Sequence, residues 1–197
     1  YTGRLLVAVS LGWAFIQAGR LSISPLLPSI TADLGLSSTS AGVGITALWG
    51  TYALMQYPSG RLSDRLSRKT LLVGGLALAC AGFLFLSSAP TYAVFLAAAV
   101  VIGLGAGLYP TPARGLVSDL FVRRRGQVFG LHTASGDAGG VVAAGLATVV
   151  VVVATWRAGF LPVVAVLALV AVSLHLWSRE EYVVARVDLA VTDLSRV

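Results

Sequence analysis

Long apolar runs, separated by short polar stretches, are the main pattern in this sequence. Each run has about the 20 residues that an α-helix needs to cross the hydrocarbon core of a bilayer. The charged side chains fall mostly between the runs, which occupy residues 5–30, 41–58, 71–89, 92–111, 127–153 and 159–177. The pattern therefore predicts an all-α, polytopic membrane protein whose six transmembrane helices form one bundle over residues 1–177.

The composition agrees with a membrane protein. Hydrophobic residues make up 57% of the chain and charged residues 11%, against about 25% charged residues in soluble domains. The net charge of +6 does not indicate nucleic acid, because the cations lie beside apolar runs, where they set topology. Cys80 is the single cysteine, and no metal-ligand spacing or catalytic motif occurs. We expect no enzyme activity, no metal, no cofactor and no nucleic-acid partner.

Cations are concentrated in alternate loops of the predicted bundle. The loops after the second and fourth runs hold eight cations, whereas the opposite side holds Arg157. Cytoplasmic loops are enriched in Lys and Arg, so both termini are predicted to be cytoplasmic, in a cell membrane. The eight cations are Arg61, Arg65, Arg68, Lys69, Arg114, Arg123, Arg124 and Arg125.

The polar string at 60–69, GRLSDRLSRK, is predicted to be a tight turn between two antiparallel helices. It resembles the loop between helices 2 and 3 of the major facilitator superfamily of secondary transporters, G-x-L-[AS]-D-R-x-G-R-[KR], with Ser67 in place of the usual glycine. The resemblance implies an N-terminal six-helix half. It also implies a conformational latch, in which Arg68 pairs with Asp119 and Asp64 meets a helix of the other half; a surface ion pair that only supports topology is the alternative. The latch residues are Gly60, Asp64, Arg65, Arg68, Lys69 and Asp119.

Residues 178–197 are much more charged than the runs before them. We interpret this segment as a cytoplasmic linker towards a missing C-terminal half. A six-helix protein that functions as two copies is the alternative.

Arg20 is the most informative charge within an apolar run. It lies about 15 residues into the first run, or roughly 22 Å along a helix, and its planar guanidinium suits a carboxylate or phosphate. Residues 15–28 resemble helix 1 of the organic-anion branches of the superfamily, although Gly19 replaces their usual Asp. An anionic substrate, an ion pair with Asp137 and a contact with backbone carbonyls are the candidate partners of Arg20. The predicted substrate-binding residues are Arg20, Gln17, Tyr52, Gln56 and Tyr109.

Asp137 and His132 are the candidate coupling residues in the fifth run. Five residues apart, they point about 140° from each other around a helix. Asp137 is predicted to carry a coupling proton or to pair with Arg20, and His132 to form a hydrogen bond or assist coupling.

The sequence favours alternating-access transport of a small organic anion. Protons or another ion are the candidate coupling ions. Proton-coupled drug efflux is the first alternative, although the drug antiporters' Arg and Gly-Pro positions hold other residues here. A non-transporting six-span module is the second alternative. The 22 glycines predict close helix packing, since small residues let backbones approach in lipid.

Overall fold

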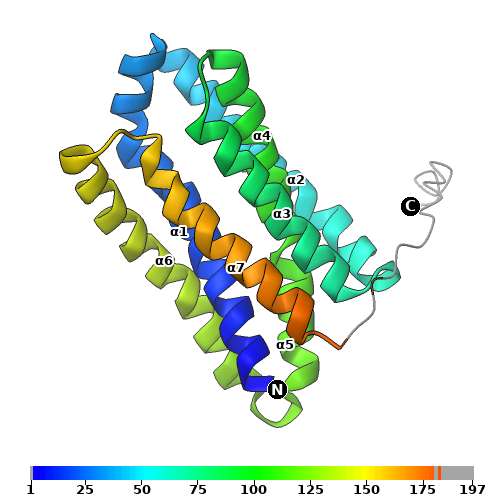
Figure 1. Cartoon of the computed structure of the whole chain (residues 1–197). Coiled ribbons are helices and arrows are strands. Elements are labelled where there is room, and N and C mark those ends of the chain that lie inside the picture. Colours follow the sequence, from blue (N-terminus) through cyan, green and yellow to red (C-terminus); the bar gives the residue numbers. More distant parts are fainter. Residues whose placement is uncertain (1, 180–181, 183–197) are drawn as a thin grey trace, which may run out of the picture.

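The computed structural model describes residues 2–179 and 182, and this part of the chain is helical, without strands (Figure 1). The long helices are followed in places by short 3-10 helices, η1 (Val122–Arg124) and η2 (Ala158–Phe160). The long helices are α1 (Thr2–Leu34), α2 (Ser38–Arg65), α3 (Arg68–Ser87), α4 (Tyr92–Leu108), α5 (Pro110–Leu120), α6 (Arg125–Val153) and α7 (Leu161–Trp177).

The helices form one bundle of six passes, because α4 and α5 follow each other as a single pass. α1 packs between α6 and α7, α4 packs between α2 and α3, and contacts between α3 and α7 join the two groups. α1 begins and α7 ends at the same end of the bundle (Figure 1). Within the described residues, five helical stretches are long and apolar enough to cross a membrane, and α2 is the less apolar sixth pass. The predicted all-α, six-helix membrane bundle is confirmed.

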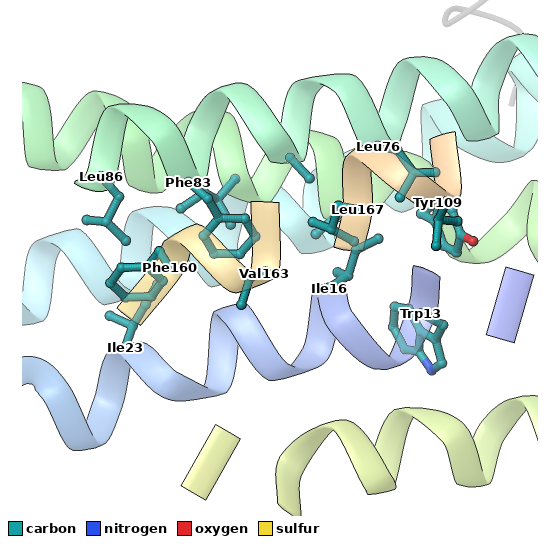
Figure 2. Close-up of a cluster of buried hydrophobic side chains, with 14 of the residues drawn as sticks. Trp13, Ile16, Ile23, Leu76, Phe83, Leu86, Tyr109, Phe160, Val163 and Leu167 are labelled. Carbon is teal, nitrogen blue, oxygen red and sulfur yellow. The ribbon is translucent and has the colours of Figure 1, made fainter. Parts of the chain in front are cut away.

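The core lies where α1, α3 and α7 meet. Phe83 of α3 stacks on Phe160, with ring centroids 5.9 Å apart, and Ile16 and Leu167 are fully buried nearby (Figure 2). These helices are apolar over most of their surface, as expected for segments that face protein on one side and lipid on the other. Packing against lipid gives no hydrophobic driving force, so close contact must hold the helices together.

Glycines provide part of that close contact. A Cβ atom built at Gly103, Gly105 or Gly139 would lie 2.4 Å or less from a backbone atom of α2, α3 or α1, respectively. A side chain there would therefore push two helices apart. Gly74 and Gly145 have nothing within 4 Å of such an atom, so the glycine content is explained by close packing at some positions and not at others.

The predicted turn at 60–69 is wrong in extent. α2 continues through Pro58 and Gly60 to Arg65, and α3 starts at Arg68, which leaves Leu66 and Ser67 as the connection. An interior proline costs a helix about 3 kcal/mol or more, and tertiary contacts offset this cost. Next to the proline, the buried hydroxyl of Ser59 donates a hydrogen bond of 2.9 Å to the carbonyl of Leu108 on α4.

The predicted ends of the first and fourth runs are also too early. α1 contains Pro25 and Pro28 and ends at Leu34, where Gly35 has a positive φ of 62°, a common helix C-cap. The fourth pass continues beyond Tyr109 as α5 to Leu120. Pro110 occupies the first position of α5, where a missing N–H costs no intrahelical bond.

Candidate functional site

Arg20 lies buried between α1 and α2, two helices that approach each other closely at few positions. Its side chain is 3% exposed. The guanidinium carbon is 4.3 Å from the ring centroid of Trp49 and 4.0 Å from that of Tyr52, both on α2. The planes of the two rings are 84° apart, so the guanidinium lies over two nearly perpendicular rings, and both contacts stabilise the cation.

Part of the hydrogen-bonding capacity of Arg20 is unused within the described residues. Its Nε and Nη1 atoms are buried and have no hydrogen-bond partner there, and the same holds for Oε1 of Gln17, one helical turn earlier. Buried polar groups nearly always have a partner. The structure thus brings together two donors and one acceptor that a ligand could satisfy.

Gln56 and Tyr109 were also predicted to bind substrate, but they lie in different environments from Arg20 and Gln17. Gln56 is one turn after Tyr52 on α2 and is exposed. Tyr109 is fully buried, and its hydroxyl donates a hydrogen bond of 2.9 Å to the carbonyl of Val9, three turns of α1 away from Arg20 (Figure 2). Tyr109 therefore joins the fourth pass to α1 inside the core.

The predicted coupling residues face different surroundings. His132 of α6 is 3% exposed, stacks on Trp13 with ring centroids 6.4 Å apart, and has Nδ1 at 3.4 Å from the hydroxyl of Ser10. Ser135 adds a hydrogen bond of 3.0 Å to the Ser10 carbonyl. Asp137 is exposed. No ion pair links Asp137 to Arg20 among the described residues, so that candidate partner of Arg20 is not observed.

Gly19 stands where the organic-anion branches usually have Asp, and the structure shows what fills that space. A Cβ atom at Gly19 would lie 2.3 Å from the ring of Phe83 on α3. Phe83 is fully buried. An aspartate at this position would collide with the core, so the chain has an aromatic packing contact in place of a carboxylate.

The end of the bundle where α1 begins carries the predicted latch residues. Arg68 forms an ion pair with Asp119 of α5, the pairing that the resemblance implied. Gly115 makes room for it, because a Cβ atom there would lie 3.0 Å from Nε of Arg68. Asp64 and Arg65 are exposed on the last turn of α2, and Gly60 lies one turn earlier.

Lys69 connects this end to the start of the predicted linker. Its Nζ donates a hydrogen bond of 3.2 Å to the carbonyl of Ser178 and lies 4.8 Å from the ring centroid of Tyr182. Tyr182 also stacks on His175 of α7. The rest of the predicted linker, 180–181 and 183–197, lies outside the described residues.

The opposite end holds a polar cluster that sequence reasoning missed. Asp33, near the end of α1, forms an ion pair with Arg157 and accepts a hydrogen bond of 3.2 Å from Nε1 of Trp156. Arg157 also donates a bond of 2.7 Å to the carbonyl of Ala89. Asp33 thus ties α1 to the connection between α6 and α7, and Arg157 extends the cluster to the connection between α3 and α4. The opposite charges of Asp33 and Arg157 were visible in the sequence, but their proximity was not.

The fold defines a polytopic membrane protein, and a buried cation lies within its span. A model of the Major Facilitator Superfamily matches residues 9–192. The chain belongs to this superfamily, which confirms the resemblance.

Curated relatives include transporters with different names. The chain is 32% identical over 155 residues to the "Gentisate transporter" of Corynebacterium glutamicum and 28% identical over 148 residues to the "Probable sulfoacetate transporter SauU" of Cupriavidus necator. These matches include 76% and 72% of this chain but 35% and 33% of the relatives. The "Multidrug resistance protein MdtL" of Escherichia coli O45:K1 is 35% identical over 106 residues, which include 53% of this chain and 27% of that protein.

Solved structures share the fold. A bacterial homologue of the human lysosomal transporter Spinster, in an inward-facing and unoccupied conformation, superimposes with a TM-score of 0.81 at 21% identity. The match includes 97% of this chain and 46% of that one. Tetrameric PepTSo2 gives a TM-score of 0.73 at 17% identity over 89% of this chain and 40% of its own.

Proposed function

We propose that this chain forms one half of a secondary transporter that moves a small organic anion across the cell membrane by alternating access. The observation that carries the proposal is the guanidinium of Arg20, buried against Trp49 and Tyr52 with two nitrogens lacking partners among the described residues. A carboxylate or sulfonate offers paired oxygen acceptors to an arginine fork. Cationic side chains within a membrane span carry a high free-energy cost, and they mark substrate pathways.

The names of two relatives support an anionic substrate, since gentisate and sulfoacetate are both organic anions. The partial coverage of all these relatives supports a second half that completes the binding cavity. In such a carrier the substrate lies near the midplane between two repeats, which rock around it. We place both termini of this half in the cytoplasm, because cations are concentrated at the end where α1 begins.

The latch is part of this mechanism. We propose that Asp64 and Arg65 contact the second half in one conformation and leave it in the other. Their exposure on the last turn of α2 supports this role, and the Arg68–Asp119 pair holds α3 and α5 in position beside them.

Proton-coupled drug efflux is the second candidate function. It is favoured by the similarity to MdtL and by the exposed position of Asp137 on α6. In that mechanism Asp137 carries the proton and Arg20 is not needed for a neutral substrate.

The test uses the full-length polypeptide that contains this chain, reconstituted in sealed vesicles. Uptake of labelled benzoate and sulfoacetate is measured for the unmodified protein, Arg20→Ala, and the control Arg4→Ala, whose side chain is exposed. We expect Arg20→Ala to lower anion uptake by about 100-fold, as loss of a buried charge-assisted contact costs roughly 2–5 kcal/mol. Arg4→Ala should keep full uptake. Drug efflux that survives Arg20→Ala and stops with Asp137→Asn would replace this function with the second candidate.

A further inference from the structure

An anion alone does not satisfy all the buried polar atoms around Arg20. Nε and Nη1 of Arg20 are donors that an anionic group satisfies, but Oε1 of Gln17 is a buried acceptor that also lacks a partner among the described residues. An anion adds acceptors and leaves that oxygen unsatisfied. A buried polar atom without a partner loses the full free energy of its hydration.

We propose that the substrate is a hydroxylated carboxylate, whose carboxylate binds Arg20 and whose hydroxyl binds Gln17; this inference rests on the proposed function. A hydroxyl suits Gln17 because it can donate to the amide oxygen and, with the amide rotated, accept from the amide nitrogen. The two side chains come from adjacent turns of α1, so they can contact one small molecule at the same time.

The surroundings limit how the ligand can lie. Trp49 and Tyr52 lie against the guanidinium at 4.3 and 4.0 Å, so a carboxylate binds Arg20 at Nε or Nη1, the two nitrogens without a partner among the described residues. On the other side, Gln17 packs against α6, because a Cβ atom at Gly139 would lie 3.1 Å from Cβ of Gln17. In the proposed complex the substrate therefore lies beside α1, close to both α2 and α6.

The spacing of Gln17 and Arg20 on α1 favours one class of hydroxy acid. Side chains three residues apart on a helix start about 5–6 Å from each other at Cβ. A hydroxyl three or more bonds from the carboxylate carbon spans this distance better than one on the adjacent carbon. 3-Hydroxybenzoate has such a hydroxyl, and benzoate is the same molecule without it.

The experiment measures equilibrium binding of 3-hydroxybenzoate and benzoate to the purified full-length polypeptide. We expect the hydroxylated acid to bind about tenfold more tightly, the usual size of one buried hydrogen bond. Gln17→Met keeps the length of the side chain and removes both polar atoms, so it should abolish the preference for 3-hydroxybenzoate over benzoate. Gln127→Met is the matched control, since Gln127 is exposed, and it should preserve the preference.

The outcomes separate this inference from the proposed function. Equal affinity for the two acids in the unmodified protein would overturn the hydroxyl assignment, and so would a preference that survives Gln17→Met. Both results would leave the Arg20 site intact if Arg20→Ala still abolishes benzoate binding. Failure of both acids to bind, with drug efflux independent of Arg20, would overturn the proposed function and this inference with it.

Discussion

The middle of the bundle and its two ends use arginine in different ways. At the ends, Arg68 pairs with Asp119 and Arg157 pairs with Asp33, and all four side chains are partly exposed. In the middle, Arg20 is buried against two aromatic rings, and no carboxylate of the described residues pairs with it. Each end therefore has one arginine that pairs with a carboxylate of the chain, whereas Arg20 in the middle pairs with none among the described residues.

This difference separates two roles of arginine, which are to hold helices together and to bind a ligand. An ion pair that is already formed holds helices together and has little capacity left for a ligand. A buried arginine without an anion is costly for the fold, and the cation–π contacts with Trp49 and Tyr52 offset only part of that cost. A ligand that supplies the anion recovers the rest, which is why the middle is the region we expect to bind substrate.

The largest effect on benzoate affinity is expected when a carboxylate is introduced next to Arg20. Tyr52→Glu places a carboxylate beside Arg20, where it should occupy the guanidinium. Affinity for benzoate should fall by at least about 30-fold, since a desolvated charge pair is worth roughly 2 kcal/mol or more. Equilibrium binding to the full-length polypeptide measures the effect. Tyr52→Gln, which adds no charge, should bind benzoate far better than Tyr52→Glu. Equal affinities in the two variants would contradict the view that Arg20 binds the anion because it lacks a carboxylate partner.

A smaller effect is expected when one of the rings is removed. Trp49→Leu removes one of the two aromatic rings that contact the Arg20 guanidinium. We expect benzoate affinity to fall about fivefold, because a cation–π contact is worth roughly 1 kcal/mol. Trp177→Leu is the matched control, as both tryptophans are 39% exposed. A loss of affinity as large in Trp177→Leu would show that the ring at position 49 has no particular role.

At the end where α1 finishes, the expected effect is on stability and not on ligand binding. Removing the Asp33–Arg157 pair should lower the free energy of unfolding by about 1 kcal/mol, the upper range for partly exposed pairs. A double-mutant cycle with Asp33→Asn and Arg157→Gln, followed by thermal unfolding in detergent, measures the coupling. Benzoate affinity should stay unchanged in all three variants. A tenfold change in affinity would mean that this end is energetically linked to the site.

The smallest effect on stability is expected at the end where α1 begins. The side chain of Asp119 is 60% exposed, so Asp119→Asn should cost less than about 0.5 kcal/mol. If the latch proposal is right, the same variant should change the rate of transport more than it changes the unfolding midpoint. Unchanged transport in vesicles would leave the Arg68–Asp119 pair as a surface contact that supports topology.

Several features of the site were predictable from local sequence alone. Arg20 stands out because a charge within an apolar run is rare, and Gln17 is one turn away on the same helix. The Arg68–Asp119 pair was implied by the match of 60–69 to a family motif. The contact of Trp49 with Arg20 was not predicted, although Trp49 and Tyr52 are three residues apart and share one face of α2.

The sequence by itself determined that this chain is a helical membrane bundle, because apolar runs of the length of a bilayer leave the backbone no other way to satisfy its hydrogen bonds. It also determined the family, through a charged motif whose spacing is local. Tertiary structure decided where α2 and the fourth pass end, since contacts such as Ser59 with Leu108 offset the cost of proline. It also decided that Asp33 meets Arg157, that Phe83 fills the space beside Gly19, and that Arg20 lies against the rings of Trp49 and Tyr52. These contacts join residues far apart in the chain, and helix packing alone sets their distances.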